Sequence, residues 1–83
     1  MTRDDLLPAL LEIARDVIGD EDLTFTAETP FAKIEEWDSM NHVHILVGME
    51  DVFRIRFDDA VALQSVVVVQ DLLDIIAGLK GLP

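Results

Sequence analysis

Ser39 is the residue of this 83-residue sequence whose position best suits chemistry. It lies in the stretch EEWDSMNHVHIL (35–46), directly after Asp38, and His42 and His44 follow it. Its hydroxyl could act as a nucleophile, accept a modification or only cap a helix, because Ser and Asp are among the commonest helix N-caps. The residues around it decide among these roles.

Neither a hydrolase nor a metal site fits this stretch. Ser39 lacks the Gly-x-Ser-x-Gly elbow of α/β hydrolases. His42 could approach Ser39 from the next helical turn, but two residues of one helix form neither an oxyanion hole nor a substrate pocket. His42 and His44 are two positions apart and point to different helical faces. We therefore predict two solvated histidines, no metal site and no catalytic residue.

A phosphate group would suit the start of this helix. The free N–H groups of a helix N-terminus and the helix dipole both favour negative charge there. A phosphodiester on the Ser39 hydroxyl would lie in that field. The sequence thus leaves two roles open for Ser39, a site of modification and a helix cap.

The composition limits the classes of function. The chain has 17 acidic and 6 basic residues, a net charge of −11 and no cysteine. This charge disfavours nucleic-acid binding and favours basic surfaces of other proteins. Without cysteine there is no disulfide, and no side chain can form a thioester, so a thiol would have to be added. The apolar runs are too short to span a membrane, and the N-terminus does not resemble a signal peptide. We expect a cytoplasmic monomer.

The hydrophobic spacing predicts one all-α domain over residues 1–83. The expected architecture is a small four-helix bundle with a long ordered loop between the first two helices and a short third helix. We expect apolar residues of the loop, among them Phe31 and Trp37, to pack across the helix ends. The expected elements are a first helix at about 2–18, the loop at 19–38, a second helix at about 39–53, a short helix at about 58–64 and a last helix at about 68–79.

The second helix carries two apolar stripes at helical spacing. The stripe expected in the core contains Ile45, Leu46, Met49, Val52 and Phe53. The other, which we call the second stripe, contains Met40, Val43 and Val47. It could pack against the loop through Phe31 and Trp37, or it could remain exposed for a partner. For the last helix, the residues expected in the core are Leu72, Leu73, Ile76 and Leu79.

The chain resembles the acyl carrier proteins, a family that includes the peptidyl carrier domains. The family's mark is Asp-Ser-Leu at the start of its second helix, and here the residues are Asp38-Ser39-Met40. The segments TPFAKIEEWDSM, ILVGMEDVFRIRF and VQDLLDIIAGL resemble the family's loop, second helix and last helix. The resemblance covers essentially the whole chain.

This resemblance implies a carrier without catalysis of its own. Ser39 would receive 4′-phosphopantetheine from coenzyme A in a reaction run by a separate phosphopantetheinyl transferase. The thiol of that arm would carry an acyl or aminoacyl group as a thioester. The implied partners are the transferase and an acyl or aminoacyl ligase or synthase with a basic docking surface. The residues implied to contact them are Asp38, Met40, Val43, Val47, Glu50 and Asp51.

The chain departs from the family near Ser39. Asn41 and His44 stand where acidic residues are common, and Arg54 and Arg56 follow the helix. We therefore expect a specialised pathway of lipid or secondary-metabolite biosynthesis rather than housekeeping fatty-acid synthesis. The alternative is a non-carrying helical protein-interaction domain in which Ser39 is only a helix cap.

Overall fold

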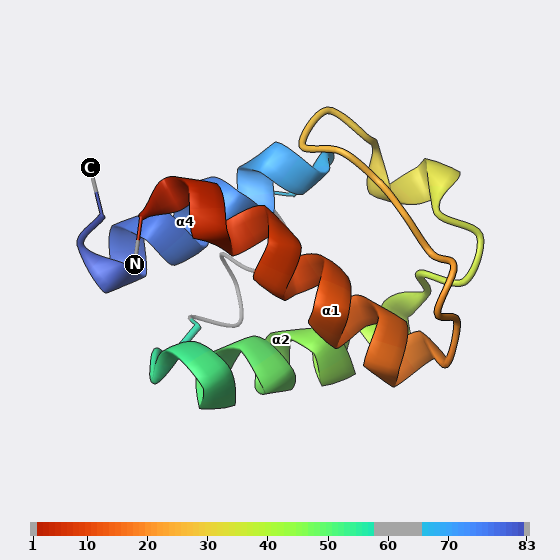
Figure 1. Ribbon diagram of the computed structural model, residues 1–83, viewed down its shortest axis with the longest axis horizontal. Helices are drawn as coiled ribbons and strands as arrows, with labels where there is room; N and C mark the ends of the chain where they lie inside the picture. Colours follow the sequence, from red (N-terminus) through yellow and green to blue (C-terminus); the bar gives the residue numbers. More distant parts are fainter. Residues whose placement is uncertain (1, 58–65, 83) are drawn as a thin grey trace.

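The computed structural model describes residues 2–57 and 66–82 of the chain (Figure 1). These residues form three α-helices and two short 3₁₀ turns, and they contain no β-strand. The expected short helix at about 58–64 falls outside the described residues. In chain order the elements are η1 (Arg3–Asp5), α1 (Leu6–Ile18), η2 (Phe31–Lys33), α2 (Ser39–Phe53) and α4 (Val69–Lys80).

Helix α1 begins and ends where its sequence favours it. Asp5 Oδ2 accepts a hydrogen bond from the Thr2 N–H at 2.9 Å, which is one half of a capping box. Pro8 lies in the first turn of α1, where a missing N–H removes no helical hydrogen bond. Gly19 ends the helix at φ 81°, a left-handed conformation that glycine adopts without steric cost.

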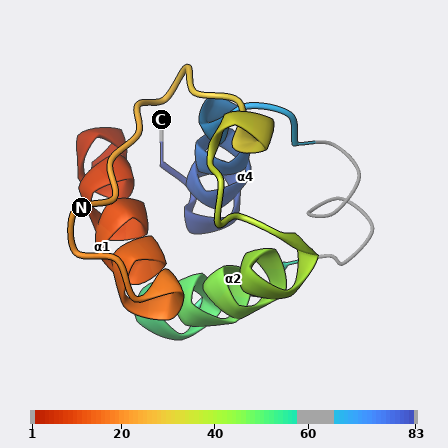
Figure 2. The same cartoon turned by 90° about the vertical axis from the view of Figure 1, so that its right-hand side faces the viewer.

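The connection from Gly19 to Asp38 is attached to the start of α4. Figure 2 shows it crossing from the end of α1 to η2, which lies beside the first turn of α4. Its Leu23, Phe25 and Ile34 are buried in the core. Three backbone hydrogen bonds join the two segments, from Phe31 N–H to Val67 O (3.0 Å), from Val69 N–H to Thr29 O (2.9 Å) and from Gln70 N–H to Ala27 O (2.7 Å).

Asp71 completes the start of α4. Its Oδ2 accepts from the N–H groups of Val67 at 2.9 Å and Val68 at 3.1 Å. These two hydrogen bonds hold the pKa of the Asp71 carboxyl below its usual range, and the bond from Val67 has the larger effect. The two residues before α4, Val67 and Val68, are therefore held in place by the connection and by the Asp71 carboxylate.

Helices α1 and α2 pack closely at Gly48. A Cβ atom at this position would lie 2.9 Å from Ile13 Cγ2, so the absence of a side chain permits the approach. The fully buried side chains come from all three helices, which places the core between them (Figure 2). The largest are Leu6, Leu10, Ile45, Met49, Phe53, Val69, Leu72 and Ile76.

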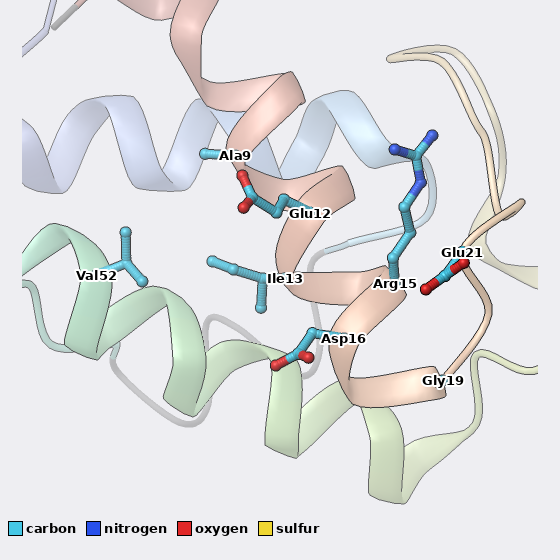
Figure 3. A pocket seen from close by; sticks show the side chains of 8 residues that line it. All are labelled: Ala9, Glu12, Ile13, Arg15, Asp16, Gly19, Glu21 and Val52. Carbon is cyan, nitrogen blue, oxygen red and sulfur yellow. The ribbon is translucent and has the colours of Figure 1, made fainter.

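Two residues expected in the core are exposed, and those predictions were wrong. Val52 is 59% exposed, and Leu79, in the last turn of α4, is 47% exposed. Val52 lies on an open groove of about 830 Å³ that carboxylates also border (Figure 3). Helical spacing identifies the side of a helix that faces the core, but it does not reveal where the covering element ends. The groove is lined by Ala9, Glu12, Ile13, Arg15, Asp16, Gly19, Glu21 and Val52.

The end of α2 is fixed by side chains as well as backbone. Arg54 has the left-handed φ of 56°, and the Ile55 N–H donates to Glu50 O at 3.1 Å. The Glu50 carboxylate accepts from the Phe57 N–H at 2.9 Å. Lys80 Nζ donates to Phe53 O at 3.2 Å, which connects the end of α4 to the end of α2.

Candidate functional site

Asp38, rather than Ser39, caps α2. Asp38 is extended at φ −98° and ψ −179°, and its Oδ1 accepts from the Asn41 N–H at 2.8 Å. Its carbonyl accepts the first intrahelical hydrogen bond, from the His42 N–H at 2.9 Å. Ser39 is the first residue inside the helix. The interpretation of Ser39 as the cap is therefore wrong, because the preceding carboxylate already fills that role.

Ser39 is exposed at the surface. Among the residues that the structure describes, no hydrogen bond joins its hydroxyl to another group. The backbone N–H groups of Ser39 and Met40 belong to the first turn, where a helix offers donors without intrahelical acceptors. The Ser39 hydroxyl is thus accessible, and the N-terminus of a fifteen-residue helix lies directly beside it.

An aromatic cluster packs beside Ser39. The rings of Phe31 and Trp37 lie 4.7 Å apart, and Phe25 contacts Trp37 edge-on at 6.0 Å. The ring of His42 lies 5.8 Å from that of Phe31 and 6.0 Å from that of Trp37. We call these four residues the aromatic cluster. The predicted packing of the loop residues Phe31 and Trp37 is confirmed, since both pack against the hydrophobic core, in which Phe25 is buried.

His42 belongs to this cluster, and the prediction of two solvated histidines was wrong for it. His42 is only 9% exposed, and its Nδ1 accepts from the indole N–H of Trp37 at 2.9 Å. This hydrogen bond assigns the neutral ring to the tautomer with its proton on Nε2. The signal in the sequence was Trp37 itself, since a packed indole usually finds an acceptor for its N–H. His44 is exposed.

A shallow pocket of about 250 Å³ opens at the aromatic cluster, and Ser39 lies on its rim. Phe31, Trp37 and His42 supply its aromatic wall. Val66, from the segment before α4, adds an aliphatic side chain that the sequence analysis did not assign to the site. The described residues that line it are Phe31, Trp37, Asp38, Ser39, His42 and Val66.

The second stripe extends along α2 from Ser39. Met40 is 68% exposed, Val43 is 45% exposed and Val47 is 55% exposed. Such exposure does not fit the interpretation that these three side chains pack against Phe31 and Trp37. The second stripe is an apolar surface next to the serine, and an exposed apolar surface of this kind is typical of contact sites.

Charged residues border the far end of the second stripe. A surface hollow there is lined by Val47, Glu50, Asp51, Arg54, Ile55 and Arg56. Asp51, Arg54 and Arg56 are exposed. Glu50 is half-buried, and its hydrogen bond with Phe57 gives it a structural role that the sequence did not reveal.

Within residues 2–57 and 66–82, no three His, Cys, Asp or Glu residues are grouped so that they could hold a metal ion. None of the helices found in that same part of the chain is long and apolar enough to cross a membrane.

The sequence matches no protein-family model and no curated protein significantly. Among solved structures, it is similar to the holo acyl carrier protein from Geobacter metallireducens, determined by solution NMR. The identity is 32%, the TM-score is 0.77, and the match covers 96% of this chain and 86% of the other. Sequence and fold agree over almost the whole length, and the chain belongs to the acyl carrier protein family.

Proposed function

We propose that this protein carries an acyl or aminoacyl group on a phosphopantetheine arm attached to Ser39. The observation that supports this most directly is the position of Ser39, an exposed hydroxyl at the first residue of α2. Because Asp38 caps the helix, the hydroxyl of Ser39 is not needed for its stability. The similar solved structure is a holo form of its family.

The residues around Ser39 fit the attachment of this group. In the proposed reaction Ser39 Oγ bonds to the phosphorus of coenzyme A that bears the pantetheine. The P–O bond to the adenosine bisphosphate half breaks, that half leaves, and the hydroxyl proton passes to a base of the transferase. The resulting phosphodiester carries negative charge, which the dipole and first-turn N–H groups of α2 favour.

The bound arm supplies a terminal thiol, on which the cargo is held as a thioester. This chain has no cysteine, so its own side chains do not compete for the cargo by thiol exchange. We place no catalysis in the chain itself. His42 lines the same pocket as Ser39, but its Nδ1 accepts from the indole N–H of Trp37 and is therefore not available as a base.

We infer that the second stripe forms the contact face for partner enzymes. Its three side chains are exposed and begin directly after Ser39. The transferase and a loading ligase or synthase must both reach this residue, so both approach that end of α2. Arg54 and Arg56 give this surface a less acidic end. This difference from the more acidic second helices that are common in the family supports a dedicated partner set in a specialised pathway.

The test is the intact mass of the purified protein after incubation with coenzyme A and a broad-specificity phosphopantetheinyl transferase. We expect the wild type to gain the mass of one arm and Ser39→Ala to gain none. Ser65 is the other serine of the chain, so Ser65→Ala is the matched control and should still be modified. If the wild type stays unmodified while a known carrier is converted, the chain is a non-carrying interaction domain.

A further inference from the structure

The pocket at the aromatic cluster contains an apolar wall that the proposed function does not use. Phe31, Trp37 and Val66 line it, and Ser39 lies on its rim. The polar lining groups Asp38 and His42 are both engaged in hydrogen bonds, Asp38 with Asn41 and His42 with Trp37. A ligand for this wall is therefore an apolar group brought close to Ser39.

We propose that this pocket binds the geminal dimethyl segment of the phosphopantetheine arm, with Trp37, Phe31 and Val66 as its contact residues. The proposal rests on the attachment of the arm to Ser39. It assigns to the aromatic cluster a second task besides packing, which is to hold the first part of the arm against the protein.

The chemistry of the arm selects this segment. Only a phosphate and one methylene group separate Ser39 Oγ from the quaternary carbon that bears the two methyl groups, so these methyl groups remain near the pocket. The next groups along the arm are a hydroxyl and amides, which lose hydrogen bonds with water when they are buried. The two methyl groups instead gain free energy on leaving water.

The wall is rigid before the arm arrives. The indole of Trp37 is held by its hydrogen bond to His42, by the ring of Phe31 at 4.7 Å and by the nearly perpendicular ring of Phe25 at 6.0 Å. A preformed wall loses little conformational entropy on binding. The covalent attachment at Ser39 also gives the arm a high effective concentration, so a contact too weak to bind free pantetheine is populated in the attached form.

Two readouts test this without any enzyme assay on the loaded carrier. Trp37 is the only tryptophan of the chain, so the tryptophan fluorescence reports the surroundings of this one pocket-lining ring. We expect the emission to change when apo protein is converted to holo protein. In NMR spectra of holo protein made with methyl-labelled coenzyme A, we expect upfield ring-current shifts of the geminal methyl signals and nuclear Overhauser contacts to the Trp37 ring.

A pair of adjacent valines supplies the matched variants. Val66 lines the pocket, whereas Val67 is exposed and is absent from the lining. Val66→Ser should weaken the methyl contacts to Trp37, and Val67→Ser should leave them unchanged. Circular dichroism of both variants shows whether the helices are intact, and the wild-type contacts test the proposal independently of either variant.

The outcomes separate this proposal from the proposed function. If the mass shows one arm on Ser39 but the methyl signals match those of free coenzyme A without contacts to Trp37, the pocket does not bind the arm, and the carrier function stands. If no arm is attached under conditions that convert a control carrier, the proposed function fails, and this proposal fails with it.

Discussion

The indole N–H of Trp37 donates to Nδ1 of His42 at 2.9 Å, and this contact joins the connection before α2 to the fourth residue of that helix. The chain between the two residues contains Asp38 and Ser39. The helix cap Asp38 and Ser39 therefore lie between two residues whose side chains are hydrogen-bonded to each other. The contact makes the geometry around Ser39 depend on a buried histidine.

Removal of the acceptor should lower stability. In His42→Leu the indole N–H of Trp37 would lose its partner, and we expect a loss of about 1–3 kcal/mol in the free energy of unfolding. His44→Leu is the matched control, because His44 is exposed on the same helix, and its effect should stay within about 0.5 kcal/mol. Urea denaturation followed by Trp37 fluorescence measures both. Equal midpoints for the two variants would show that the Trp37–His42 contact contributes nothing.

The sequence indicated the family and the start of α2, and it did so for physical reasons. The resemblance to acyl carrier proteins is confirmed by the similar solved structure. The pair Asp38-Ser39 marked a helix start because both side chains suit the N-cap, but their type alone could not decide which of them caps. The structure decides it through the bond from Asn41 N–H to Asp38 Oδ1.

Other features depend on contacts between distant segments, which local patterns do not encode. The burial of His42 requires Trp37 and Phe31 to fold over it, and its i, i+2 spacing to His44 gave no sign of that. The exposure of Val52 depends on where α1 covers α2. The hydrogen bonds between the connection and α4 are made by backbone groups, which every residue type has, so no side-chain pattern reveals them.

Gly48→Ala should test the close packing of α1 on α2. The added Cβ would lie 2.9 Å from Ile13 Cγ2, a branched methyl group close to its own backbone. We expect a net loss of about 1 kcal/mol, because an overpacking cost of about 1–3 kcal/mol exceeds the helix-propensity gain of about 1 kcal/mol. The measurement is the free energy of unfolding in urea.

Gly78→Ala is the control for that substitution. Gly78 also lies in a helix, but a Cβ there would meet nothing within 4 Å. It should therefore show only the gain in helix propensity, about 0.5–1 kcal/mol. If Gly48→Ala stabilises the protein as much as Gly78→Ala, α1 and α2 do not approach each other as closely as described.

Asp71 should make the free energy of unfolding depend on pH in the acidic range. Its pKa is lowered by the hydrogen bonds from Val67 and then Val68. A carboxyl with a lowered folded-state pKa stabilises the protein above its unfolded pKa of about 3.9, and this contribution is lost as the pH falls through the lower folded-state value. Asp71→Asn should thus be less stable than the wild type at neutral pH, and the difference should shrink in strong acid.

Thermal unfolding of both proteins between neutral and strongly acidic pH measures this difference. Asp16→Asn controls for the loss of one negative charge, since Asp16 lies on α1 and does not accept a hydrogen bond from the residues before α4. A gap between wild type and Asp71→Asn that stays constant down to the lowest pH would show that the two backbone bonds to this carboxylate do not stabilise its charged form.

We expect Glu50 and Asp51 to have different roles, Glu50 in stabilising the fold and Asp51 in attracting partner proteins. The Glu50 carboxylate accepts from the Phe57 N–H, whereas Asp51 is exposed beside Val47. We expect Glu50→Lys to lower the free energy of unfolding by about 1–3 kcal/mol, since that N–H loses its charged acceptor. Asp51→Lys should change it by no more than about 0.5 kcal/mol.

Asp51→Lys and Met40→Ala test how the transferase contacts α2. Asp51→Lys should slow the modification of Ser39 at low salt and slow it less at high salt, because the Debye length falls from about 10 Å at 0.1 M to about 3 Å at 1 M. Met40 is apolar, 68% exposed and adjacent to Ser39, so Met40→Ala should slow modification by a similar factor at both salt concentrations. The rates come from intact mass at timed intervals, with circular dichroism as the check on folding.

If Met40→Ala is modified as fast as the wild type at both salt concentrations, the transferase does not contact the second stripe through Met40. A slow rate for Asp51→Lys that salt does not relieve would instead place Asp51 in direct contact with the enzyme.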